Sequence, residues 1–151
     1  MRQFKKRQQK SPLVFSIFFT LLLAIISTGC SPKVGLYTQR AYENATSIKA
    51  QSLIIMDKAT TPYSNNVAEI DRLVLAVEQA YQYSKGLPKN DLAAKQWEII
   101  KDPSRNLLGG FLKRWKDKGK MGRAIVNASK GIVADSFDTI VKLEVGKMRS
   151  N

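Results

Sequence analysis

The chain has 151 residues, with 25 Lys or Arg against 12 Asp or Glu, a formal net charge of +13, no His and one Cys. This length is typical of one domain with one core. The lack of His removes the commonest general base and metal ligand, which disfavours hydrolytic triads, zinc sites and His-ligated haem. A single Cys excludes an intramolecular disulfide and a metal site of several thiolates.

The first 29 residues have the pattern of an export signal. Five basic residues and no acid precede an apolar run from Leu13 to Ile26, and small residues then lead to Cys30. The apolar run has 14 residues, whereas a helix needs roughly 20 to cross a bilayer. The sequence therefore predicts an N-terminal signal segment, not a permanent span.

The segment Ser27-Thr28-Gly29-Cys30 resembles the lipobox of bacterial lipoprotein precursors. The resemblance implies cleavage between Gly29 and Cys30 and a lipid such as palmitate on the cysteine sulfur. Ser27 stands where the family usually has an aliphatic residue, so an uncleaved anchor in the inner membrane is the alternative. In Gram-negative members of the family, a residue such as Ser31 after the cysteine implies the outer membrane and its periplasmic face.

We therefore divide the chain into a signal peptide (1–29), a lipidated cysteine with a very short tether (30–33) and a helical domain (34–151). Removal of the signal peptide leaves 20 basic and 12 acidic residues, a net charge of +8. A first helix is predicted over residues 34–60, ending before Pro62. Its small and apolar residues recur at spacings of three and four on one face, namely Ala41, Ala45, Ile48, Ser52, Ile55 and Ala59.

A second helix is predicted from Asn66, which forms a capping box with Glu69, to about residue 85, with Gly86 as its left-handed cap. Its proposed inner face is Val67, Ile70, Val74, Val77, Tyr81 and Ser84. A third helical region starts at residue 91 and is bent or split near Asp102-Pro103, where Asp102 is expected to cap a new helix. Gly109-Gly110 then indicates either close packing or a kink.

The last helix is predicted over residues 121–148. Its proposed inner face is Ile125, Ala128, Ile132, Ser136, Ile140 and Leu143, with Val133 and Phe137 beside it. No alternation typical of strands is present. The fold class is therefore all-α: an antiparallel helical bundle of about four long helices, following the signal segment.

A basic cluster, residues 113–120, is the main candidate site. Its members are Lys113, Arg114, Trp115, Lys116, Lys118 and Lys120. One interpretation is a solvated helix end, whose cations complement the helix dipole. The other is a contact with an anionic surface, with Trp115 at the level of the headgroups and the lysines on phosphates.

The acidic residues are scattered, and neither a Glu-x-x-His motif nor a Gly-rich phosphate loop occurs. We therefore expect no enzyme, no cofactor and no metal. The leading hypothesis is a membrane-tethered envelope lipoprotein that acts as a non-catalytic interaction or structural module, with an envelope protein as its partner. The alternatives are a cationic binder of anionic lipids or polymers and, third, a carboxylate-based envelope enzyme. Export argues against a nucleic-acid partner.

Overall fold

The computed structural model describes residues 35–150, and every regular element in that range is helical. The predicted signal peptide, Cys30 and the tether lie outside the described residues. The α-helices are α2 (Gln39–Asp57), α3 (Val67–Gly86), α4 (Asp91–Lys101), α5 (Leu108–Lys118) and α6 (Arg123–Ser150). Two short 3-10 helices, η1 (Lys58–Thr60) and η2 (Tyr63–Asn65), connect α2 to α3.

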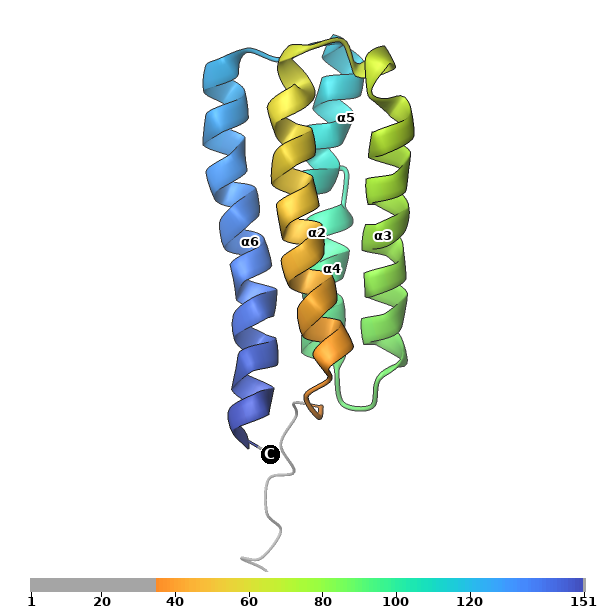
Figure 1. The fold of residues 1–151 in the computed structure, drawn as a ribbon, viewed down its shortest axis with the longest axis vertical. Coiled ribbons are helices and arrows are strands. Elements are labelled where there is room, and N and C mark those ends of the chain that lie inside the picture. The colour runs from red at the N-terminus through yellow and green to blue at the C-terminus, as the bar shows by residue number, and fades with distance from the viewer. Residues whose placement is uncertain (1–34, 151) are drawn as a thin grey trace, which may run out of the picture. The chain divides into compact units, whose positions relative to one another are not determined.

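The helices pack side by side around one core (Figure 1). Helix α2 packs most extensively against α6 and also against α3, while α4 packs against α3 and α6. Helices α4 and α5 follow one another along the same side (Figure 1). We call the end with Gly35 and the α3–α4 turn the entry end. The opposite end, with the α2–α3 and α5–α6 connections, is the far end.

Aromatic and aliphatic side chains from all the α-helices fill the core. The largest completely buried side chains are Trp97, Trp115, Phe111, Phe137 and Met56. The rings of Trp97 and Phe137 meet edge to face with centroids 5.8 Å apart, a favourable geometry for aromatic pairs. The inner face predicted for the first helix is confirmed, because all six of its residues are buried.

The inner faces predicted for the second and last helices are partly wrong. Val67 and Val74 of α3 are exposed, and Leu73 takes the place of Val74 in the core. In α6, Ile132 is 52% exposed and the neighbouring Val133 is buried. Each helix has two adjacent apolar lines with the same spacing, so periodicity alone does not decide which line faces inward.

The third helical region is split, but not by the predicted cap. The Asp102 carboxylate accepts hydrogen bonds from the Ser104 backbone N–H (2.8 Å) and hydroxyl (2.7 Å), and α5 begins only at Leu108. A Cβ at Gly109 would lie 2.2 Å from the Lys101 carbonyl oxygen, and one at Gly110 would lie 1.7 Å from that of Arg105. Of the two alternatives for the glycine pair, close backbone packing is therefore observed.

Two further turn predictions are wrong. Gly86 is the last residue of α3, and the left-handed residue in the following turn is Lys89, with φ of 56°. The Asn66 amide donates to the Thr61 hydroxyl and the Pro62 carbonyl, while Glu69 pairs with Lys58. The polar groups of these turns thus bind partners that the local sequence pattern does not identify.

Candidate functional site

Trp115 belongs to the core and not to the surface of the basic cluster. Its side chain is completely buried, its indole N–H donates to the Thr61 carbonyl oxygen at 3.1 Å, and its ring meets Tyr63 edge to face at 5.5 Å. The reason is its place on α5, where Phe111 and Leu112 face inward four and three residues earlier, respectively. The prediction that Trp115 lies at the level of lipid headgroups is therefore wrong.

Two backbone hydrogen bonds hold the loop that follows α5. The Gly119 carbonyl oxygen accepts from the Tyr63 N–H, and the Met121 N–H donates to the Ala59 carbonyl, both at 2.7 Å. Gly119 has φ of 75°, a conformation that glycine adopts without strain. The buried Met121 side chain adds a third attachment. The loop is therefore fixed against the α2–α3 connection.

The structure divides the basic residues of this segment into two groups. Lys113 pairs with Asp117, and Arg114 donates to Asn106 at 2.7 Å. Among the described residues, Lys116, Lys118 and Lys120 are exposed and form no ion pair. Arg123, at the start of α6, donates a hydrogen bond to the Thr60 hydroxyl at 3.4 Å.

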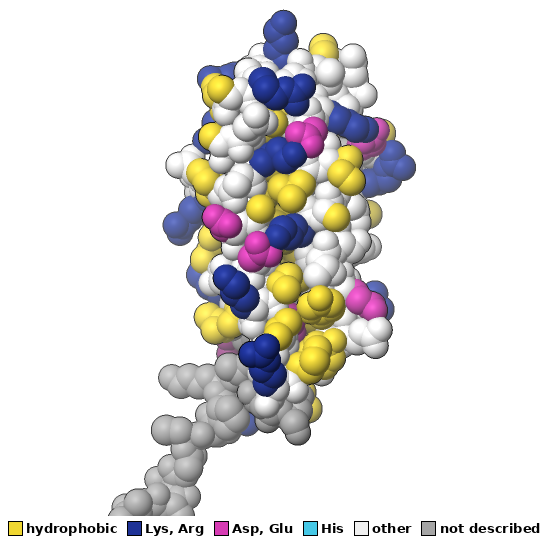
Figure 2. Space-filling view, turned by 60° about the vertical axis from the view of Figure 1, so that its left-hand side comes forward, with side chains coloured by type: hydrophobic (Ala, Val, Ile, Leu, Met, Phe, Trp, Pro, Cys, Tyr) yellow, Lys and Arg dark blue, Asp and Glu magenta, His cyan; other side chains and the backbone are white. Residues whose placement is uncertain are grey.

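We call Lys116, Lys118, Lys120 and Arg123 the cationic end. Figure 2 shows that the far end of the bundle is rich in basic side chains. The sequence prediction missed Arg123, because its position beside the lysines depends on the turn between α5 and α6. Lys116 and Lys118 in the last turn of α5 and Lys120 on the fixed loop are exposed cations. They are suited to bind anions, since little backbone ordering is needed on binding.

The cationic end lies far from the place where the chain enters the bundle. Helix α2 has 19 residues and is therefore roughly 28 Å long at 1.5 Å per residue. Helix α2 begins close to Gly35 and ends beside the loop that follows α5 (Figure 1). About 30 Å, the length of α2 with its connection, therefore separates the entry end from the cationic end.

Most acidic side chains of the described region form ion pairs with basic ones. The pairs are Asp57–Lys130, Glu69–Lys58, Glu78–Lys101, Glu98–Lys95, Asp102–Arg105, Asp117–Lys113, Asp138–Lys49 and Glu144–Lys147. The hydrogen bonds from Lys58 and Lys101 lower the pKa of Glu69 and Glu78 respectively. Residues 35–150 contain no cluster of three or more Cys, Asp or Glu side chains that could hold a metal.

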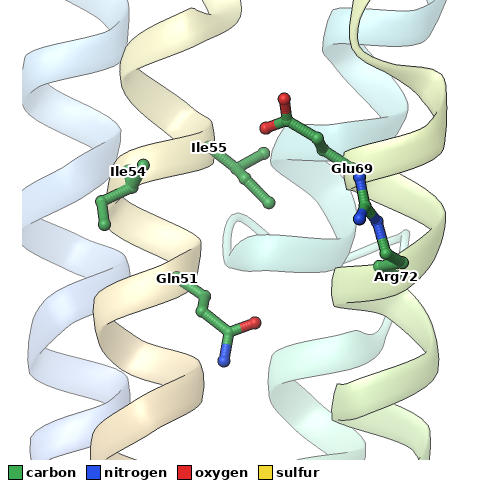
Figure 3. A pocket seen from close by; sticks show the side chains of 5 residues that line it. All are labelled: Gln51, Ile54, Ile55, Glu69 and Arg72. Atoms are coloured by element: carbon green, nitrogen blue, oxygen red, sulfur yellow. The ribbon is translucent and has the colours of Figure 1, made fainter.

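A shallow groove of about 340 Å³ lies between α2 and α3. Its lining residues are Gln51, Ile54, Ile55, Glu69 and Arg72. Figure 3 shows side chains from both helices around it. Ile54 is exposed and Ile55 is buried, while Glu69 is already bound by Lys58. The lining is therefore mixed, and its one carboxylate is held in an ion pair.

The entry end contains a buried polar cluster that sequence reasoning missed. Glu144 and Lys147 of α6 are 1% and 3% exposed. The Lys147 ammonium donates to the Glu144 carboxylate at 2.6 Å and to the Asn90 amide oxygen at 2.5 Å, and the Asn90 amide donates to the Ser84 carbonyl at 2.9 Å. This cluster joins α6 to the α3–α4 turn. Charged residues near the end of a helix read as exposed in a sequence, so no signal pointed to it.

No protein-family model, curated protein or solved structure matches this chain. Within residues 35–150, no helix combines the length and the apolar character that crossing a membrane requires.

Proposed function

We propose that the protein is a membrane-tethered, non-catalytic module of the cell envelope, held by a lipid on Cys30. In this proposal, α4 and α5 act as one interrupted column, so that the domain is an antiparallel four-helix bundle. The module contacts another envelope component through its helical surface. The proposed location is the periplasmic face of the outer membrane.

The observation that carries the proposal is that the chain enters the bundle at one end, close to Cys30. Gly35 packs closely on the α3–α4 turn, since a Cβ at Gly35 would lie 2.5 Å from the Pro88 carbonyl oxygen. Only four residues separate Gly35 from Cys30. A lipid on Cys30 therefore keeps the entry end near its bilayer. In an upright molecule, the far end then points away from that bilayer.

The ion pairs support a non-catalytic role. A general base or nucleophile needs a group that is free to exchange a proton or attack a substrate. The carboxylates of Glu69 and Glu78 instead accept hydrogen bonds from lysines on neighbouring elements, which keep the pKa of each carboxyl below its usual range. Their arrangement fits a structural role that links the helices.

The first experiment compares the full chain with Cys30→Ala in a bacterial host, by intact mass and membrane fractionation. We expect a wild-type species that begins at residue 30, carries acyl mass and sediments with membranes. The Cys30→Ala chain should lack the acyl mass and the cleavage. An unprocessed 151-residue species in both strains would contradict the lipid anchor.

A second candidate function, binding of an anionic surface, is supported by the exposed lysines of the cationic end, which lie in the last turn of α5 and on the fixed loop that follows it. In an upright tethered molecule, these lysines face a surface other than the anchoring bilayer. Salt sensitivity is expected, because exposed charges are screened over about 8 to 10 Å at physiological ionic strength.

The test places the full chain in zwitterionic vesicles and measures capture of a second, anionic vesicle population. Replacing Lys116, Lys118 and Lys120 together by Ala should abolish capture. The control variant replaces Arg40, Arg72 and Lys85 by Ala. These residues are exposed on α2 and α3, and their replacement removes the same amount of positive charge. Equal loss in both variants, or capture that does not respond to salt, would remove this second candidate.

A further inference from the structure

The outer face of α6 carries a symmetric pattern of exposed residues. Gly131, Asp135, Lys142 and Gly146 are all exposed, and their spacings of four, seven and four place them along one line of an α-helix. This line lies opposite the buried residues of α6. The view toward α6 in Figure 2 shows acidic and basic side chains interspersed with apolar ones.

Two charges on this line have no partner among the described residues. Lys130 and Asp138 of α6 pair with Asp57 and Lys49 of α2. No such pair exists within residues 35–150 for Asp135 or Lys142. Seven residues correspond to about 10 Å along the helix, which is too far for a direct pair between the two. One anion and one cation therefore remain available to an external surface.

The spacing of these four residues is the same in either direction along the helix, and the two inner residues carry opposite charges. The line is therefore complementary to its own reverse, which identifies the occupant. We propose that the outer face of α6 binds the α6 of a second copy of this chain in antiparallel orientation. A two-fold axis between Asp138 and Thr139 places Asp135 opposite Lys142 of the second copy, and the symmetry repeats the pair. Such an interface is isologous and closed.

The glycines and the exposed aliphatic residues agree with the same axis. Glycine inside a helix costs about 1 kcal/mol relative to Ala, yet a Cβ at Gly131 would meet nothing within 4 Å in one copy. The axis sets Gly131 opposite Gly146 of the second copy, where two helices can approach closely. Ile132 and the half-buried Leu143 share one flank of α6, and the axis brings each near the other across the interface.

The antiparallel orientation of the two copies brings opposite ends of the bundle together. An antiparallel pair sets the cationic end of each copy beside the entry end of the other. If the tether of the proposed function holds both copies, a two-fold axis along the bilayer normal lets both bundles lie along one membrane. In that arrangement the bundles lie flat and not upright, so the lysines of the cationic end reach the headgroups of the anchoring bilayer instead of a second surface. This consequence rests on the proposed function, whereas the pairing itself does not.

The test uses charge reversal in the full chain, purified in detergent, with sedimentation velocity over a range of concentrations. We expect a dimer for the wild type and a Kd at least about tenfold weaker for Asp135→Lys and for Lys142→Asp, since each reversal sets like charges opposite each other. The double variant Asp135→Lys/Lys142→Asp exchanges the two charges and should restore the wild-type Kd. Far-UV circular dichroism and thermal unfolding check that every variant is folded.

Arg72→Asp is the control, because it reverses an exposed charge on α3 and should leave the Kd unchanged. A wild-type chain that stays monomeric at the highest concentration would overturn the proposal. So would a double variant that is as weak as the singles, because the antiparallel register would then be wrong. The Cys30→Ala chain should still dimerise, so loss of the anchor and loss of pairing are separate results.

Discussion

The glycines of this chain show how one residue type meets different local demands. Gly109 and Gly110 stand where the first turn of α5 presses on the backbone of the preceding connection. Gly119 instead provides a left-handed backbone in the loop of the cationic end. Gly131 meets neither demand, because it has helical backbone geometry and open space around its missing Cβ.

Replacing Gly110 by Ala should destabilise the fold strongly, because the new Cβ would lie 1.7 Å from the Arg105 carbonyl oxygen. Backbone must move to relieve this overlap, and we expect a loss of about 3 kcal/mol in the free energy of unfolding. Urea unfolding measures it. Gly131→Ala is the matched control, and below the concentration of dimerisation it should gain about 0.5 to 1 kcal/mol. Equal effects at the two positions would contradict this account.

The sequence alone indicated which of these residues were important, but it did not identify their contacts. Adjacent glycines were recognisable as a packing device or a kink, but their contact surface belongs to residues 101 and 105, whose position depends on the turn. The sequence prediction places Trp115 at the surface of the basic cluster, although its spacing from Phe111 and Leu112 puts it on the inward face of α5. Its partners Thr61 and Tyr63 lie more than 50 residues earlier. Local sequence carries no information about such distant partners.

At the scale of elements, the inner face of the first helix was predictable, and that of the last helix was predictable only in part. One face of α2 combines small and apolar residues, and the structure buries that face. Helix α6 has two apolar lines side by side, and its inner face also includes Glu144 and Lys147. Because the two charges neutralise each other, the helix can bury them, but hydrophobic periodicity assigns both to the surface.

The Glu144–Lys147 pair should behave as a coupled unit. Lys147→Met leaves the Glu144 carboxylate buried without its partner, and Glu144→Leu leaves the ammonium in the same position. Each single change should cost about 3 to 5 kcal/mol, while the double change should cost much less, because an apolar pair of similar size has no charge to desolvate. A double-mutant cycle by urea unfolding measures the coupling. Additive costs would show that the two residues act independently.

At the scale of the whole molecule, ion pairs connect different elements. Lys101 of α4 binds Glu78 of α3, and Lys58 of η1 binds Glu69 of α3. The hydrogen bond from Lys101 is the main cause that lowers the pKa of Glu78 below its ordinary value of 4.5. A carboxyl with a lower pKa in the folded state contributes stability above the unfolded pKa and loses it as pH falls through the folded pKa.

We therefore expect the free energy of unfolding to decrease as pH falls below about 4.5, the ordinary pKa of Glu. Lys101→Met removes the partner of Glu78, so the variant should lose less stability over this pH range than the wild type does. Lys116→Met is the control, since Lys116 is exposed and has no ion pair within the described residues, and it should follow the wild-type curve. Urea unfolding at several pH values measures the free energy of unfolding of the wild type and both variants. An equal decrease below about pH 4.5 in the wild type and in Lys101→Met would show that the Lys101–Glu78 pair is not the cause.

The close packing of α2 on α6 has a consequence for biosynthesis. Ribosomes deliver the 28 residues of α6 after α2 to α5, and at about 5 to 20 residues per second this takes roughly 1.4 to 6 s. Until then, α2 lacks the helix that covers most of its inner face. The nascent chain therefore cannot complete its core until α6 has been made. If the chain is exported as proposed, this late completion would leave it unfolded for longer before translocation.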